Sequence, residues 1–160
     1  MRILAGDPGS PDALVLIAEL SAALAAITGD PGTASFDPDD VRGARAAFLL
    51  AYDGDGADGA PLGCGALRPL DAERGEIKRM YARPGTGGVG AALLAQLEQA
   101  ARGFGYQALV LSTRRVNQRA VDFYRRHGYA DIAPYGRYAG VTRSICLGKD
   151  LQAAAQADFL

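Results

Sequence analysis

Hydrophobic positions follow two periods along this chain, and these periods divide it into expected strands and helices. Short apolar runs bounded by glycine, proline and aspartate predict strands at residues 1–5, 46–52, 62–70, 76–83, 107–113, 129–135 and 142–147. Apolar residues spaced three and four apart predict helices at residues 11–28, 90–102 and 117–127. This order predicts an α/β fold with a mixed, mostly antiparallel sheet of six to seven strands and helices on both faces.

Local signals mark the ends of these helices. Ser10 is a residue type typical of a helix N-cap, Pro11 suits the first helical position, and Gly29 is placed to end the first helix. Gly103 and Gly128 are expected to end the second and third helices. The stripe of the first helix that should lie on the sheet comprises Ile17, Leu20, Ser21, Leu24 and Ile27.

Two segments lack hydrophobic periodicity. Residues 30–45 predict a loop with at most one brief helix; such a segment often lies over a substrate site in enzymes, although a surface loop is the default interpretation. Residues 53–61 predict the tip of an antiparallel hairpin. There Asp53, Asp55 and Asp58 alternate with glycine as in calcium loops, but the glutamate that closes such a loop is missing. We therefore favour a solvated hairpin tip and no metal site.

Length and charge narrow the possible classes of protein. A chain of 160 residues predicts a single domain, residues 1–160, with a tail from about residue 152 that is expected to be a frayed helix. Its 17 basic and 18 acidic side chains give a net charge of −1. This balance argues against a protein whose main task is to neutralise nucleic-acid phosphates.

The cysteines and the N-terminus indicate the compartment. Cys64 and Cys146 stand far apart and have no metal-binding spacing, so we expect buried, reduced thiols. The chain does not begin with a basic leader followed by an apolar segment, and we expect no apolar run of membrane-spanning length. The sequence thus predicts a soluble, cytoplasmic protein without a membrane partner.

A glycine-rich turn joins a strand to a helix within residues 75–94. It contains Gly85, Gly87, Gly88 and Gly90, which free the backbone for positive φ and for close approach of a ligand. The first N–H groups of the helix lack intrahelical partners and carry partial positive charge, so they suit a pyrophosphate. A tight connection that binds nothing is the alternative.

The same turn, GTGGVG, has the G-x-G-x-x-G spacing of a dinucleotide-binding oxidoreductase. Such enzymes usually place a uniformly apolar strand before the turn, whereas Glu76, Lys78 and Arg79 interrupt this one. The acidic residue expected about 20 residues later is also absent from residues 107–113. We rank this alternative low.

Residues 62–151 resemble the GCN5-related N-acetyltransferase (GNAT) superfamily. The resemblance lies in GEIKRMYARPGTGGVGAALL, LVLSTRRVNQRAVDFYRRHGY and YGRYAGVTRSICLGKDL, which combine the glycine turn with a later Asn-x-x-Ala-x-x-x-Tyr helix. It implies that acetyl-CoA is the cofactor and that two splayed strands admit its pantetheine arm. The resemblance further implies that the backbone of the turn binds the pyrophosphate, through Thr86, Gly87, Gly88, Val89, Gly90 and Ala91. Gly85 stands where the family usually has Arg or Gln.

The resemblance also implies roles for the last helix and the central strand. Asn117 and Tyr124 are expected on one helix face, with Asn117 touching the pantetheine and Tyr124 donating a proton to the sulfur. A core aromatic beside Phe123 is the alternative for Tyr124. The backbone N–H groups of residues 80–82 would polarise the thioester carbonyl in the manner of an oxyanion hole. These residues are Met80, Tyr81 and Ala82.

Glu76 matches a position where several family members carry a base, which implies that it deprotonates the acceptor ammonium directly or through water. A surface carboxylate paired with Lys78 or Arg74 is the alternative. His127 is expected to cap the third helix and to bind no metal. A basic cluster could meet the 3′-phosphate of coenzyme A, but most of its members are expected on a solvated face: Arg114, Arg115, Arg119, Arg125 and Arg126. A loop that could line the acceptor pocket contains Tyr135, Arg137 and Tyr138.

Taken together, the resemblance and the residues predict an enzyme that transfers an acetyl group from acetyl-CoA to a primary amine of a small molecule or peptide. Direct attack in a ternary complex is expected, without a covalent acyl-enzyme. The non-enzymatic alternative is a binding or regulatory module that keeps the fold and the coenzyme pocket. A homodimer is possible, as is frequent in the family.

Overall fold

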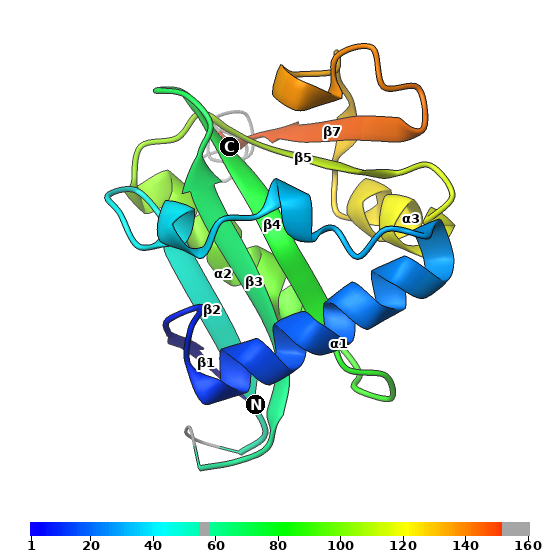
Figure 1. Ribbon diagram of the computed structural model, residues 1–160. Helices are drawn as coiled ribbons and strands as arrows, with labels where there is room; N and C mark the ends of the chain where they lie inside the picture. The colour runs from blue at the N-terminus through cyan, green and yellow to red at the C-terminus, as the bar shows by residue number, and fades with distance from the viewer. Residues whose placement is uncertain (55–57, 152–160) are drawn as a thin grey trace.

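The computed structural model of the protein describes residues 1–54 and 58–151. Within them a seven-stranded sheet has the order β1-β2-β3-β4-β5-β7-β6 (Figure 1). Its strands are β1 (Arg2–Ala5), β2 (Ala47–Tyr52), β3 (Pro61–Pro69), β4 (Arg74–Ala82), β5 (Ala108–Arg114), β6 (Ala130–Asp131) and β7 (Ser144–Asp150). The β4–β5 pair is parallel and the other paired neighbours are antiparallel. The predicted mixed, mostly antiparallel α/β fold is confirmed.

Helices cover both faces of this sheet, as predicted. They are α1 (Pro11–Thr28), α2 (Val89–Gly103) and α3 (Gln118–Arg126), with short 3-10 helices η1 (Thr33–Ser35), η2 (Pro38–Val41) and η3 (Gly136–Tyr138). In Figure 1, α1 crosses the near face of the sheet and α2 lies behind it. Each of these two faces therefore has its own buried core.

The core on the α2 side is the larger one. Leu94 and Leu97 of α2 and Val121 of α3 pack there against buried side chains of the central strands, which include Leu67, Ile77, Leu109, Leu111 and Leu147. On the opposite face, Ala13 and Leu16 of α1 pack against a cluster that includes Phe48, Leu50, Cys64 and Ala66. Both cysteines are buried and free, as predicted.

The cap signals of α1 are confirmed, and its predicted stripe is confirmed except at Ile27. The Ser10 side chain accepts a hydrogen bond from the N–H of Ala13, and Gly29 ends the helix at φ 82°. Leu20 is buried and Ile17 packs against the core of this face, whereas Ile27 is 48% exposed. The C-terminal half of α1 lies over a cavity, which Leu24 lines, and not over continuous sheet.

The expectation that no apolar run reaches membrane-spanning length is wrong for α1. Its 18 residues have a mean hydropathy of 1.6, which is long and apolar enough to cross a membrane by length and composition. In the fold this helix contacts β3 and β4, and 17% of it is buried. Length and composition alone therefore do not assign it to a membrane.

Several element boundaries also differ from the predictions. The strand expected at residues 129–135 is only two residues long, because Pro134 has no N–H to continue the ladder. Gly103 is the last residue of α2, and the left-handed residue that follows the helix end is Gly105. Residues 30–45 hold two 3-10 helices in place of at most one.

The hairpin predicted between β2 and β3 is present, although Asp55 at its tip lies outside the described residues. Across residues 1–54 and 58–151, no cluster of three or more His, Cys, Asp or Glu side chains is placed to hold a metal ion.

Gly63 sets how closely β3 and β4 approach each other beside the glycine turn. A Cβ at this position would overlap the backbone oxygen of Tyr81 and lie 3.0 Å from the Val89 side chain. We expect Gly63→Ala to lower the free energy of unfolding by about 1–3 kcal/mol, as overpacking does. Gly43→Ala is the control, because a Cβ there meets no atom within 4 Å. Urea denaturation checks both variants, and equal midpoints would contradict the argument.

Candidate active site

The central feature of the site is the separation of β4 from β5. These parallel strands pair at only three positions, Arg74 with Ala108, Gly75 with Leu109 and Glu76 with Val110. Beyond that point β4 continues to Ala82 and β5 to Arg114 without pairing to each other. The sheet therefore opens between the C-terminal ends of two adjacent strands, and ligands of α/β proteins bind at such ends.

A bulge in β4 lies beside this opening. Cys64 pairs with Tyr81 and Ala66 with Lys78, so two residues of β4, Arg79 and Met80, face the single Gly65. Arg79 has a φ of 51°, a strained conformation for a residue with a side chain. Bulges leave a residue out of the ladder and re-aim the strand. Strain of this kind concentrates at functional sites.

A cavity of about 160 Å³ fills the opening. Met80 and Lys78 line it from β4, Ser112 and Thr113 from β5, and Tyr124 from α3. Its other lining residues are Leu20, Leu24, Gly32, Ser35, Phe36, Ile77, Arg79, Leu111, Asn117, Ala120 and Tyr138. The structure thus brings three predicted site residues, Met80, Asn117 and Tyr124, to one cavity.

Tyr124 belongs both to the core and to the cavity. Its side chain is 6% exposed, and its ring makes edge contacts with Phe123 and Tyr129 at centroid distances of 5.1 and 5.5 Å. No hydrogen bond joins its hydroxyl to another residue in the described part of the chain. Burial raises the pKa of Tyr124, so the phenol stays protonated at neutral pH. The ring is held in place while the O–H remains available to a ligand.

Asn117 is the N-cap of α3, one residue before the helix, where it was expected inside it. Its side-chain oxygen accepts a hydrogen bond from the Ala120 N–H at 3.4 Å. The side-chain NH₂ takes no part in that cap, so it can donate toward the cavity that Asn117 lines.

Glu76 is buried, which contradicts the alternative of a surface carboxylate. Its side chain is 1% exposed and accepts hydrogen bonds from Arg68 Nε at 2.7 Å and the Tyr135 hydroxyl at 2.6 Å. Lys78 Nζ lies 3.8 Å from Glu76 Oε2, the oxygen that accepts from Tyr135. Arg74 pairs with Asp71 and not with Glu76. Glu76 lines neither described cavity, so it does not face the opening directly.

The glycine turn is ordered by its own backbone. The carbonyl oxygen of Arg83 accepts hydrogen bonds from the N–H and hydroxyl of Thr86. Gly85 and Gly88 have φ values of 80° and 76°, whereas Gly87 and Gly90 do not use positive φ. Gly88 is the N-cap of α2 and no side chain caps this helix end. The N–H groups of the first turn, including Gly90 and Ala91, therefore lack intrahelical partners.

Side chains on both sides of the turn hold it in position. Val89 is 2% exposed and packs into a small core with Ala51 and Leu93. Arg83 pairs with Glu19 of α1 at 2.7 Å, and the Tyr81 hydroxyl donates to the same carboxylate at 3.0 Å. Ala82 is the last residue of β4. The start of α2 is thereby fixed relative to β4 and α1.

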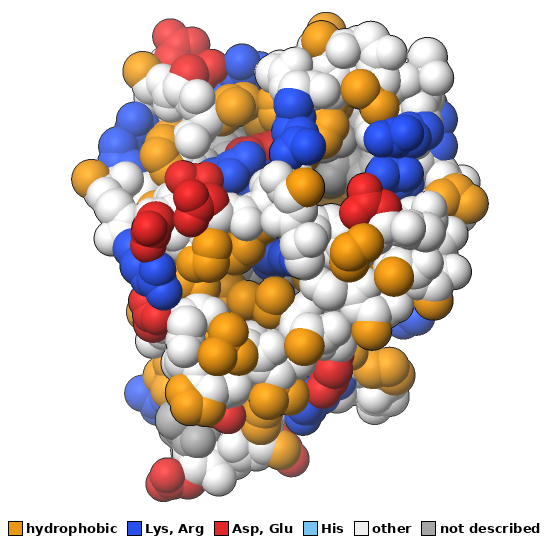
Figure 2. Space-filling view, in the orientation of Figure 1, with side chains coloured by type: hydrophobic (Ala, Val, Ile, Leu, Met, Phe, Trp, Pro, Cys, Tyr) orange, Lys and Arg blue, Asp and Glu red, His pale blue; other side chains and the backbone are white. Residues whose placement is uncertain are grey.

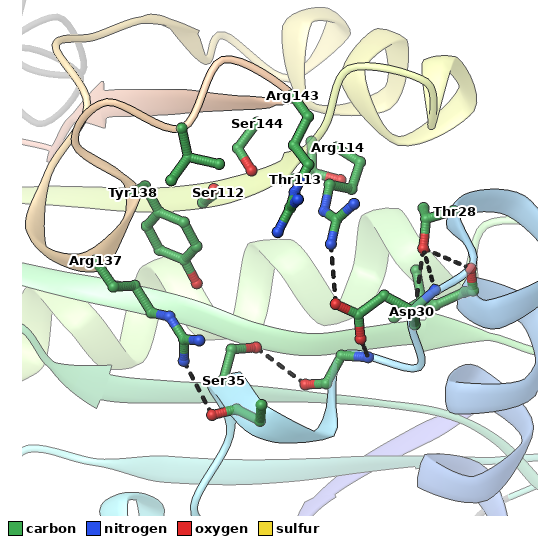
Figure 3. Close-up of a pocket in the computed structure, with 14 residues that line it drawn as sticks. Thr28, Asp30, Ser35, Ser112, Thr113, Arg114, Arg137, Tyr138, Arg143 and Ser144 are labelled. Atoms are coloured by element: carbon green, nitrogen blue, oxygen red, sulfur yellow. Dashed lines mark hydrogen bonds and ion pairs between the residues drawn. The ribbon is translucent and has the colours of Figure 1, made fainter.

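A second cavity, of about 250 Å³, adjoins the first. It lies between the end of α1 with η1, the end of β5, and the loop around η3 (Figure 3). Charged and polar side chains line much of it: Thr28, Asp30, Ser35, Ser112, Thr113, Arg114, Arg137, Tyr138, Arg143 and Ser144. Arg137 and Tyr138 line this cavity, whereas Tyr135 is turned toward Glu76; that the loop lines the acceptor pocket stays a prediction.

Sequence reasoning missed Asp30, Ser35 and Arg143 as site residues. The available signal was the aperiodic segment at residues 30–45, which is largely at the surface as expected, but whose Asp30 and Ser35 also line the larger cavity. Among the basic cluster, Arg114 lines the cavity and pairs with Asp30 at 2.9 Å. Arg125 pairs with Asp131 at the surface. His127 is the C-cap of α3, as predicted.

Comparison with known proteins identifies the family. A family model described as the acetyltransferase (GNAT) family matches residues 19–129. The chain belongs to the GNAT acetyltransferase family. It is 36% identical over 108 residues to the IAA acetyltransferase of Azospirillum brasilense, a match that covers 65% of this chain and 67% of that protein.

Solved structures agree with this membership. A protein of Klebsiella pneumoniae subsp. pneumoniae, provisionally named an acyl-CoA N-acyltransferase, has a TM-score of 0.77 at 26% identity. That match covers 94% of this chain and 97% of the other. A GNAT acetyltransferase of Elizabethkingia anophelis with acetyl-CoA bound shares the fold, with a TM-score of 0.65 at 18% identity over 93% of this chain and 97% of its own.

The described residues fit the coenzyme that GNAT acetyltransferases bind. The α2 N-terminus has no capping side chain, and β4 and β5 leave a cavity between them. The buried Tyr124 hydroxyl there lacks a partner in the described chain. The family membership and the mostly antiparallel sheet argue against the dinucleotide-binding alternative.

The ion pair between Glu76 and Arg68 is expected to stabilise the fold, because it sits at the last paired position of β4 and β5. Glu76→Gln removes the negative charge but keeps the size, and should lower the free energy of unfolding by about 3 kcal/mol. Asp40→Asn is the matched control, since Asp40 pairs with the same arginine but is 45% exposed, and it should cost at most about 1 kcal/mol. Urea denaturation followed by circular dichroism measures both; similar losses for the two variants would contradict this ranking.

Proposed function

We propose that this GNAT protein transfers an acetyl group from acetyl-CoA to a primary amine by direct attack in a ternary complex. The observation that carries the proposal is the buried Tyr124 hydroxyl, which lines the opening between β4 and β5 and lacks a partner among the described residues. A proton donor without a protein acceptor, placed where two strands diverge, is what a departing thiolate requires.

Backbone groups would hold the coenzyme. The N–H groups from Thr86 to Ala91 supply a cradle for a pyrophosphate at the uncapped start of α2. Residues 80–82 and the Asn117 side chain flank the opening, where they would donate hydrogen bonds to the pantetheine. The coenzyme supplies the thioester, whose acetyl carbon accepts the amine nitrogen.

Groups of the protein then stabilise or neutralise the charges that develop during the transfer. As the new C–N bond forms, negative charge develops on the carbonyl oxygen, and main-chain N–H groups beside the β4 bulge stabilise it. As the C–S bond breaks, Tyr124 donates its proton to the sulfur. The ammonium loses two protons as it becomes an amide: one passes to solvent before the attack, and the other restores the phenol that protonated the sulfur, so protons balance over the cycle.

Glu76 stays a candidate for the base, but only at a distance. It is bonded to Arg68 and Tyr135 and does not line the cavities, so the ammonium proton would have to reach it through Lys78 or water. Lys78 lies 3.8 Å from Glu76, lines the cavity, and donates to the Tyr138 hydroxyl at 2.8 Å. A second role of Glu76, holding the point where the strands diverge, follows from the same contacts.

A non-catalytic module that binds acyl-CoA is the alternative, and calorimetry combined with a free-thiol assay separates the two. Binding of acetyl-CoA together with amine-dependent thiol release supports the enzyme. Binding without turnover over a broad amine panel supports the module. The cytoplasmic location, the single domain and the homodimer stay predictions.

Tyr124→Phe removes only the proposed proton donor. We expect kcat to fall about a hundredfold or more while acetyl-CoA binding changes little, because the ring and its contacts remain. Tyr106→Phe is the matched control: Tyr106 is also fully buried, but its hydroxyl donates to the Arg45 carbonyl oxygen, away from the cavities. Steady-state thiol release and calorimetry measure the two effects. An unchanged kcat in Tyr124→Phe removes this residue from the mechanism.

Gly90→Pro deletes one N–H of the proposed phosphate cradle. The first turn of a helix tolerates proline, because its N–H groups have no intrahelical acceptor. Gly90→Ala is the baseline, since it keeps the N–H and its Cβ would make only ordinary contact, 3.5 Å, with Phe123. We expect the proline variant to bind acetyl-CoA about tenfold or more weakly than the alanine variant, the value of a charge-assisted hydrogen bond. Equal affinities by calorimetry would place the diphosphate elsewhere.

A further inference from the structure

The geometry points to an acceptor amine that also carries an anionic group, a carboxylate or a phosphonate-like group, which Arg143 and Arg137 bind in the cavity beside η1 and η3. This inference rests on the proposed function, because it names the class of acceptor for the same site. The whole chain carries a net charge of −1, so a positive cavity is not a consequence of composition.

Basic side chains dominate the two adjoining cavities. Arg114, Arg137 and Arg143 line the larger one, and Lys78 and Arg79 line the smaller one. Asp30 is the one acidic residue among the lining residues of either cavity. The cavities form one continuous region, because they share six lining residues: Leu24, Gly32, Ser35, Ser112, Thr113 and Tyr138.

Two of the arginines in the larger cavity have no carboxylate partner. Asp30 pairs with Arg114 at 2.9 Å, so these two charges offset each other. Arg137 donates to the neutral carbonyl oxygen of Ala34 at 2.9 Å. The Arg143 side chain makes no hydrogen bond or ion pair to the residues that the structure describes, and only its backbone oxygen accepts one, from the Arg115 N–H. Figure 3 shows Arg137 and Arg143 entering the cavity from different segments, with Asp30 and Ser35 on its other side.

The positive charge around this cavity affects the pKa of its one lining carboxylate, Asp30. The Gly32 N–H holds the pKa of Asp30 below its usual range, and the charges of Arg114, Arg143 and Arg137 add to this effect. Figure 2 shows Lys and Arg side chains gathered on the upper right of this face of the molecule. A ligand group that enters here therefore meets a surplus of positive charge.

The buried guanidinium of Arg79 supports an anionic ligand independently of the other arginines. It is only 8% exposed and lines the smaller cavity, yet its guanidinium bonds only neutral oxygens, Pro31 O at 3.3 Å and Ser21 Oγ at 3.1 Å. Its Nε is buried without a hydrogen-bond partner in the described chain. A buried cation without a counter-charge is costly, and an anionic ligand nearby would offset that cost.

The arginines lie away from the turn that is proposed to bind the pyrophosphate of the coenzyme. Residues 85–91 line neither cavity, and in Figure 1 the turn after β4 lies across α1 from η1 and η3. The same surplus of positive charge disfavours polyamines and other polycationic acceptors, because like charges repel in a partly enclosed site. Guanidinium groups suit carboxylates and phosphonates, which they bind in bidentate geometry.

The test uses matched amines that differ in charge at one group. β-Alanine, 2-aminoethylphosphonate and β-alaninamide form one set, L-phenylalanine and L-phenylalaninamide a second, and spermidine is the polycation. With acetyl-CoA and the intact protein, we expect kcat/KM from thiol release to be at least about tenfold higher for an anionic member than for its amide. The carboxylate and phosphonate arms show which anion the cavity prefers.

Arg143→Gln and Arg137→Gln should each remove most of that preference by raising KM about tenfold, with kcat nearly unchanged and acetyl-CoA affinity unchanged. Arg143→Glu should shift the preference toward the amide. Arg126→Gln is the control with the same loss of charge, because Arg126 is exposed and lines neither cavity.

Two kinds of result would overturn the inference while leaving the proposed function standing. One concerns the acceptors: acetyl-CoA binds, but the amides or spermidine are used as well as or better than every anionic amine. The same conclusion follows if no anionic amine reacts, or if none binds to the CoA-loaded protein by calorimetry. The other is that the arginine variants weaken acetyl-CoA binding as strongly as Gly90→Pro does, which would assign them to the coenzyme. Failure of the proposed function looks different, since acetyl-CoA itself would then not bind or react.

Discussion

The site depends on the point where β4 and β5 stop pairing. In a sheet nearly every backbone N–H and C=O group is bonded, so strands that diverge expose main-chain donors that a ligand can use. The last paired position joins Glu76 to Val110. At that position Glu76 is bonded to Arg68 of β3 and to Tyr135 of the loop before η3. A buried ionic network thus fixes the base of the opening, and the opening admits the coenzyme proposed here.

The rest of the fold supplies this opening with two kinds of wall. Rigid elements make the first: the β4 bulge, the β5 end and α3, which bring Met80, Ser112 and Tyr124 to one cavity. Loops make the second, because residues 30–35 and the segment around η3 enclose the larger cavity. The residues of the proposed acetyl transfer lie on the rigid elements. The loops would select the acceptor, since loops vary without disturbing the sheet.

Local signals in the sequence predicted the features that local interactions determine. Ser10 and Gly29 cap α1, and the glycine turn opens α2, because these depend on neighbouring residues. The order of strands and the cavity position of Tyr124 were also predictable, the latter through the family resemblance. The bulge at Arg79 was not, because it depends on register with β3 and not on a residue type that favours positive φ.

Contacts between distant residues account for the remaining differences. Glu76 is bonded at 2.7 Å to Arg68, its cross-strand partner, whereas Lys78 lies 3.8 Å away and Arg74 pairs with Asp71 instead. Asp30 and Arg114 are 84 positions apart, and their pairing needs the end of α1 to reach the end of β5. Since charge balance along a chain says nothing about where charges meet, a chain of net charge −1 can still enclose a positive cavity. Placement by the fold, and not composition, therefore sets the electrostatics that an acceptor would encounter.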